Sequence, residues 1–155
     1  MKIKNVILVI LLIISFNLSA DTVLNHASVN QLIMNVQEST KKQDVNKLAS
    51  YLAEDATITI VNLSNAGDTM NLTKTDYINM LKLNWALSAK FSYEVKNINI
   101  IISENEKSAT VSDFTIETVE MDGKIIASSQ SQENIKIIIS GGVPKIQSIH
   151  SNVKM

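Results

Sequence analysis

The chain of 155 residues contains no cysteine, no arginine, one proline and four glycines. The absence of cysteine excludes disulfide bonds, cysteine-ligated zinc and cysteine nucleophiles. With two histidines, a histidine-based metal site is not expected. The phosphate-binding motifs GxGxxG and GxxxxGK[ST] are both absent. We therefore expect no metal and no cofactor. The chain is 45% hydrophobic and 19% charged, which is an ordinary balance for one folded domain.

Residues 1–20 are typical of a secretory signal peptide. Lys2 and Lys4 precede the unbroken apolar run 6–16, and small residues end at Ala20. The run is shorter than the roughly 17–25 residues that span a bilayer, so we expect cleavage and no stable membrane insertion afterwards. The mature domain would be residues 21–155. Without cysteine, an exported bacterial domain, periplasmic or secreted, is favoured over a secreted animal domain, because small animal domains depend on disulfides.

Cleavage also decides the charge of the mature chain. It removes two lysines and leaves 12 lysines against 15 Asp and Glu residues, a formal charge of −3. No basic cluster offsets this charge. Since nucleic acid is bound through clustered Lys and Arg, we expect no nucleic-acid partner.

Three helices are predicted in the first part of the mature chain. Ser28 and Gln31 have the spacing of a capping box, and apolar residues then recur at helical intervals. Asp44 is suited to capping a second helix, which ends at an acidic pair. Thr73 and Asp76 have the same capping-box spacing at the start of a third helix.

The remaining segments alternate like strands. Asp122-Gly123 favours a type I′ hairpin turn. The alternation changes face near Asn97 and again at Asp113, and both changes indicate β-bulges that curve the sheet. We predict an α+β fold, a cone-shaped, strongly curved antiparallel sheet wrapped around three N-terminal helices. The alternative is a cystatin-like curved sheet with fewer helices. The predicted strands are 56–63, 69–72, 91–102, 109–116, 125–139 and 143–153.

The order of these elements resembles the nuclear-transport-factor-2-like superfamily, which includes ketosteroid isomerases and SnoaL-type cyclases. The likeness is carried by DVNKLASYLAEDAT at 44–57, a short helix that ends in an acidic pair before an apolar strand, and by the tryptophan of the third helix. It covers roughly residues 28–153. It implies a cone whose sheet leaves a cavity open at one end, and it implies a homodimer formed through the sheet.

The isomerase mechanism does not carry over to this chain. In those relatives the catalytic aspartate follows the threonine of the acidic-acidic-Ala-Thr motif by three positions. On Glu54-Asp55-Ala56-Thr57 that position is Ile60, which cannot transfer a proton. The sequence leaves enzyme activity undecided and favours a domain without catalysis.

Several polar and aromatic residues are candidates for a ligand pocket. Trp85 could stack on a flat ligand, and Tyr51 and Tyr77 could place hydroxyl groups in the cavity, although each ring could equally belong to the core or the rim. Ser129, Ser131 and Glu133 form a polar stripe that we assign to solvent or a dimer contact. The predicted pocket residues are Tyr51, Tyr77, Trp85, Asp113 and Glu117.

Asp113 and His150 are the candidates for acid–base catalysis. Asp is disfavoured in strands, and a carboxyl group turned toward an apolar interior would have a raised pKa. A histidine beside an inward carboxylate is a plausible proton carrier. Both residues could instead be exposed or structural.

Three functions follow from these observations. The first is an exported domain that binds a small apolar or amphipathic molecule. The second is a cofactor-free isomerase, dehydratase or cyclase that uses acid–base residues of the cavity. The third is a protein-interaction or dimerisation module, which requires a filled cavity and a large apolar patch on the sheet.

Overall fold

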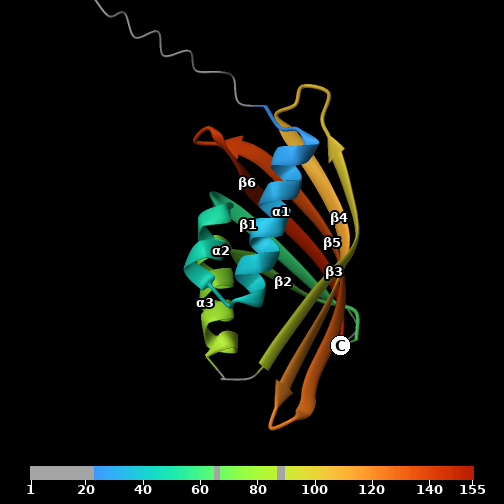
Figure 1. The fold of residues 1–155 in the computed structure, drawn as a ribbon. Helices are drawn as coiled ribbons and strands as arrows, with labels where there is room; N and C mark the ends of the chain where they lie inside the picture. Colours follow the sequence, from blue (N-terminus) through green and yellow to red (C-terminus); the bar gives the residue numbers. More distant parts are fainter. Residues whose placement is uncertain (1–22, 65–66, 87–89) are drawn as a thin grey trace, which may run out of the picture.

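The computed structural model describes residues 23–64, 67–86 and 90–155. The predicted signal peptide lies outside the described residues. The described chain is an α+β domain in which helices cover one face of a curved sheet (Figure 1). No described helix is long and apolar enough to cross a membrane. The elements are α1 (His26–Lys41), α2 (Val45–Tyr51), β1 (Leu52–Asn62), β2 (Asp68–Thr73), α3 (Lys74–Trp85), β3 (Lys90–Ile102), β4 (Ser108–Met121), β5 (Lys124–Ser140) and β6 (Val143–Lys154).

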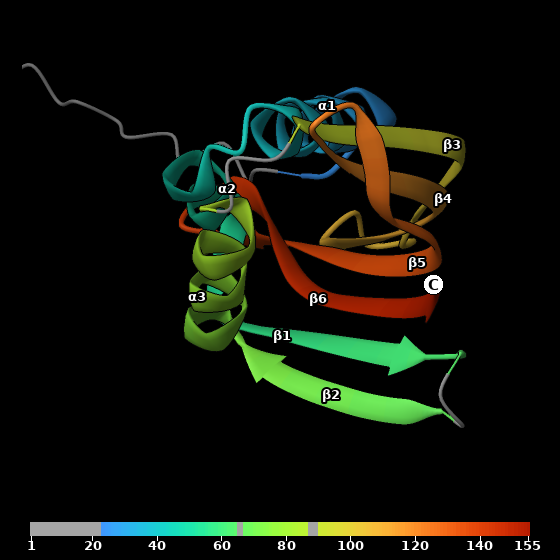
Figure 2. The ribbon, with the colours of Figure 1, turned by 90° about the horizontal axis from the view of Figure 1, so that it is seen from below.

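The six described strands form one sheet in the order β2-β1-β6-β5-β4-β3. Figure 2 shows the sheet curving beneath α1, with α3 standing at the end where β1 and β2 meet it. All neighbouring pairs are antiparallel except β1 and β6, which are parallel. The wholly antiparallel sheet expected from the sequence was therefore wrong in this one pair. The turn after β5 makes β6 antiparallel to β5, and β6 then runs in the same direction as its other neighbour, β1.

The helix starts follow from side-chain caps. Asp44 accepts a hydrogen bond from the Lys47 amide, and Thr73 and Asp76 form the predicted capping box. The predicted start at Ser28 was wrong. Asn25 is the N-cap, and Ser28 is the third helical residue that completes its capping box. Asn is as good a cap as Ser, and the choice between them depends on where tertiary packing places the first turn.

The core lies between α1 and the half of the sheet nearest the β3–β4 and β5–β6 turns. Val29 and Ile33 of α1 are buried against fully buried strand residues, among them Val111, Ile137 and Ile146. These strand residues come from β4, β5 and β6, so one helix closes over three strands. This packing leaves the opposite half of the sheet uncovered by α1.

One of the two predicted bulges is present. Asn97 has φ 55° and the β3–β4 register shifts between Lys96 and Asn99, as the change of alternation predicted. The predicted switch at Asp113 was wrong, because β4 pairs with β5 in unbroken register past this residue. The shift in the β3–β4 register lies opposite Asp113, but the extra residue belongs to β3. Asp113 stays on the same face as Val111. The alternation was hidden because Phe114, on the opposite face, is also apolar and half-buried.

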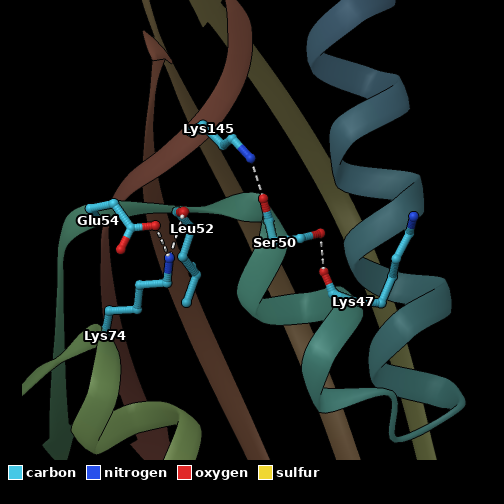
Figure 3. A network of polar contacts seen from close by, with 6 residues as sticks. All are labelled: Lys47, Ser50, Leu52, Glu54, Lys74 and Lys145. Carbon is cyan, nitrogen blue, oxygen red and sulfur yellow. Dashed lines mark hydrogen bonds and ion pairs between the residues drawn. The ribbon is translucent and has the colours of Figure 1, made fainter. Parts of the chain in front are cut away.

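A polar corner fixes the point where α2 becomes β1 (Figure 3). The Lys74 ammonium donates to the Leu52 carbonyl at 3.3 Å and to Glu54 Oε1 at 2.8 Å, which ties α3 to the start of β1. Lys145 of β6 donates to the Ser50 carbonyl at the end of α2. Two lysines thus satisfy backbone carbonyls at this helix end, where no intrahelical donor is available. The contacts hold α2, α3 and the sheet together at one rim.

Candidate ligand-binding cavity

A cavity of about 400 Å³ lies between the helices and the inner face of the sheet. Its walls come from α1, α2 and α3 and from every described strand except β2. This volume is in the range of small-molecule sites, which are mostly apolar with a few polar groups. The apolar lining includes Ile33, Val36, Leu48, Ile58, Ile60, Met80, Leu81, Ile135, Ile149 and Val153.

The sheet register places the polar lining in ordered rows. Asp113 on β4 lies opposite Glu133 on β5, which lies opposite Ser151 on β6, which lies opposite Ile60 on β1. Beside this row, toward the core, lies an apolar row that includes Val111 and Ile135. The acidic row therefore marks the boundary between the packed core and the cavity.

The next rows lead to the open end of the cavity. Glu117 lies opposite Ser129 on one side and Tyr93 on the other, and Val119 lies opposite Ala127 one step further out. Along β5 the side chains change from buried at Ser131 to exposed at Ala127. The mouth is therefore near the β4–β5 hairpin.

Asp113 is the least solvent-exposed of the cavity acids. It is 6% exposed, and its Oδ1 atom has no hydrogen-bond partner among the described residues. Glu133 Oε1 accepts a hydrogen bond of 3.3 Å from the Ser151 hydroxyl. Glu133 and Glu117 are half-buried, and both line the cavity. Three carboxyl groups thus share a space largely shielded from bulk water.

This shielding shifts the acid equilibria. Burial raises the pKa of Asp113 to about 6. Burial raises the pKa of Glu133 to about 8, with repulsion from Asp113 and Glu117 adding to it. The pKa of Glu117 is also raised by burial, although a hydrogen bond from Ser129 opposes the shift. Because removal from water disfavours the charged form, all three shifts have one direction.

Aromatic side chains of α3 and β3 form another part of the cavity wall. The Trp85 and Phe91 ring centroids are 6.2 Å apart, and Phe91 stacks on Tyr93 at 6.3 Å with planes 15° apart. Burial first, and then the neighbouring acids, raise the pKa values of Tyr77 and Tyr93, so both phenols remain protonated donors. The cavity therefore presents flat apolar surfaces and two hydroxyl groups to a ligand.

The structure places four of the five predicted pocket residues at the cavity: Tyr77, Trp85, Asp113 and Glu117. Tyr51 is half-buried against the core and does not line the cavity, and Lys47 lies 5.7 Å from its ring centre. His150 is exposed on the outer face, one residue from the inward-facing Ile149. Asp113 and His150 therefore do not meet in one pocket.

Other cavity residues were missed or misassigned. The stripe of Ser129, Ser131 and Glu133 faces the cavity, whereas solvent or a dimer contact was favoured from the sequence. The signal was available, because Glu133 shares its face with Ile135 two positions along. Tyr93 and Ser151 were not predicted at all, although alternation places each on the inward face of its strand.

The charges of the cavity are of one sign. Among the described residues that line it there is no lysine, arginine or histidine. Within the described parts of the chain, no group of three His, Cys, Asp or Glu side chains is arranged to hold a metal ion. The acids of the cavity are therefore uncompensated by protein cations.

Comparison with known proteins relates this fold to others. No family model and no curated protein matches the sequence. Solved structures do match. The β subunit of benzoate 1,2-dioxygenase from Burkholderia mallei is 13% identical, with a TM-score of 0.69 over 84% of this chain and 91% of the other.

Two matches from Novosphingobium aromaticivorans extend the comparison. A scytalone-dehydratase-like protein is 16% identical, with a TM-score of 0.65 over 83% of each chain. A nuclear-transport-factor-2-like protein with a cystatin-like fold is 11% identical, with a TM-score of 0.65 over 81% of this chain and 79% of that one. At these identities the likeness establishes the fold alone. The chain has the nuclear-transport-factor-2-like fold.

Proposed function

We propose that this protein is an exported domain that binds a small, largely apolar molecule in the cavity between its helices and its sheet. The observation that carries the proposal is a cavity of about 400 Å³ that the side chains do not fill. Most of its walls are apolar, and its polar residues lie mainly along two strands. Such a site buries a hydrophobic body and orients it through a few polar groups. Export rests on the predicted signal peptide at residues 1–20.

Blocking the mouth is expected to abolish binding. Ala127 lines the cavity near its open end, and Ser128 is exposed on the opposite face of the same strand. A tryptophan at Ala127 projects into the cavity, whereas the same residue at Ser128 projects into solvent. We expect Ala127→Trp to lower the affinity for the neutral fluorophore prodan at least about tenfold, as measured by its emission shift.

Ser128→Trp is the matched control and should bind prodan like the unmodified protein. Equal prodan affinity in Ala127→Trp and the unmodified protein, with both folded by circular dichroism, would place the binding surface elsewhere.

Acid–base catalysis is the second candidate, and one observation favours it. Asp113 and Glu133 lie directly opposite each other, and burial sets their pKa values apart at about 6 and about 8. Near neutral pH one group can accept a proton while the other can donate one. Ile60, at the position of the isomerase base, lies in the same row on β1. Catalysis in this cavity would therefore use Glu133, two strands away from Ile60, and Asp113, three strands away. Deuterium uptake beside the carbonyl of bound 2-tetralone, lost in Asp113→Asn, would distinguish catalysis from binding.

The outer face of the sheet gives less support to an interaction module. That alternative requires a filled cavity and a broad apolar patch. The central strands instead expose polar residues on this face, and Ile101 of the edge strand β3 is an exposed apolar residue there. The exposed polar residues are Thr110, Gln132, Asn134, Lys136 and His150. A homodimer through the sheet stays a prediction from the resemblance.

A further inference from the structure

The carboxyl groups of the cavity have no protein counter-ion. The four described ion pairs use other acids, Glu38, Glu54, Glu94 and Glu120. The described cavity lining contains three acids and no basic side chain. Burying an ionised carboxylate without a partner is costly, and proteins generally supply a cation or several hydrogen-bond donors.

Asp113 is the clearest case. Its side chain is buried, it lines the cavity, and its Oδ1 atom accepts no hydrogen bond from any described residue. Neither Glu133 nor Glu117 can serve it as a counter-ion, since both are also acids. A buried acceptor left unsatisfied costs about 1–3 kcal/mol, and more when charged. A ligand that brings a donor to this atom recovers that free energy.

The surroundings of the acids suit an organic cation. Tyr77 and Tyr93 line the same cavity, and Phe91 and Trp85 continue the aromatic wall toward the mouth. The faces of aromatic rings attract cations within about 6 Å, most strongly when water is excluded. Apolar walls then cover the remainder of the molecule.

We propose that the ligand is a small amine with an apolar body, whose ammonium group is bound at Asp113 and Glu133. This inference rests on the proposed function and specifies the ligand class of the same cavity. The ammonium donates to the free Asp113 oxygen, and the hydrocarbon lies against the aromatic wall. An ionised Asp113 repels anionic ligands, and the repulsion acts in a space of low dielectric constant.

The groups that line the cavity together with Asp113 determine the pH dependence. The titratable ones are Glu117 of β4, Glu133 of β5 and the hydroxyls of Tyr77 on α3 and Tyr93 on β3, and the neutral ones include Ser151 of β6 and Gln37 of α1. No described group among these gains a positive charge on acidification. Amine binding should therefore weaken as pH falls from about 7.5 to about 5, because Asp113, whose pKa is about 6, becomes protonated while an alkylammonium remains charged.

Three isosteric probes test the charge preference. 1-Adamantylmethylamine, 1-adamantylmethanol and 1-adamantanecarboxylate differ in charge and hardly in size. We expect the amine to displace prodan at concentrations at least about tenfold lower than the alcohol, and the carboxylate not to displace it. Asp113→Asn should reduce the affinity of the amine about tenfold, to that of the alcohol. Asp68→Asn, the same change at an exposed residue of β2, should leave all three affinities unchanged.

Two results would overturn the inference in different ways. If the alcohol displaces prodan as well as the amine does, the preference for a cation is wrong, while the cavity remains the binding site. If prodan and all three probes fail to bind the folded protein, the proposed function is wrong and this inference with it.

Discussion

Acidification from about pH 8.5 to about pH 5.5 is expected to stabilise the folded protein by about 4 kcal/mol. The largest part comes from Glu133, whose pKa is raised from 4.5 to about 8, with a further part from Asp113, raised from 3.8 to about 6. In this range the folded state binds more protons than the unfolded state. The free energy of unfolding therefore falls as pH rises, and the loss ends above the folded pKa values.

Glu133→Gln isolates this effect, because it removes the charge and keeps the shape. We expect the variant to be about 3 kcal/mol more stable than the unmodified protein near pH 8.5, with a flatter pH profile in urea unfolding. Glu104→Gln, at an exposed turn, is the control and should change neither. Acids with lowered pKa values, such as Glu38, make the protein less stable on acidification, but this loss occurs at a pH below this range. If the free energy of unfolding instead rises from pH 5.5 to pH 8.5, these carboxyl groups are solvated in the folded protein.

Ile137→Ala is expected to lower the free energy of unfolding by about 3 kcal/mol, because Ile137 is fully buried and the truncation leaves a void in the core. Ile125 lies on the same strand and is 68% exposed. Ile125→Ala should change the stability by less than about 0.5 kcal/mol. The measurement is chemical unfolding of both variants at one pH.

These two isoleucines test the placement of the core at one end of β5. Equal losses in the two variants would mean that α1 does not cover the sheet as described. A large loss at Ile125 alone would indicate that the hairpin end is packed against another surface, such as a second copy of the chain.

Local signals predicted much of the fold. Asp44 and the Thr73–Asp76 pair act within a few residues of their own helices, so their roles can be read from spacing alone. The bulge at Asn97 was readable because the apolar pattern changes face there. At Asp113 the same reasoning failed, because apolar residues lie on both faces of β4 and hide its phase.

The remaining features depend on contacts between distant parts of the chain. The parallel pairing of β1 and β6 joins segments about 90 residues apart, which no local pattern encodes. Helical spacing could not tell that Tyr77 faces the cavity while Tyr51 lies beside the core. The alternation along the strands was sufficient to place two residues. Glu133 faces inward because it has the parity of Ile135, and His150 faces outward because it follows the inward-facing Ile149.

The most direct test is a crystal structure of the protein with prodan bound. Binding in the cavity predicts that the naphthalene rings lie against the aromatic wall of Trp85 and Phe91, with the carbonyl end toward the acidic row of β4 and β5. Prodan on the outer face of the sheet, with nothing bound between the helices and the inner face, would contradict it.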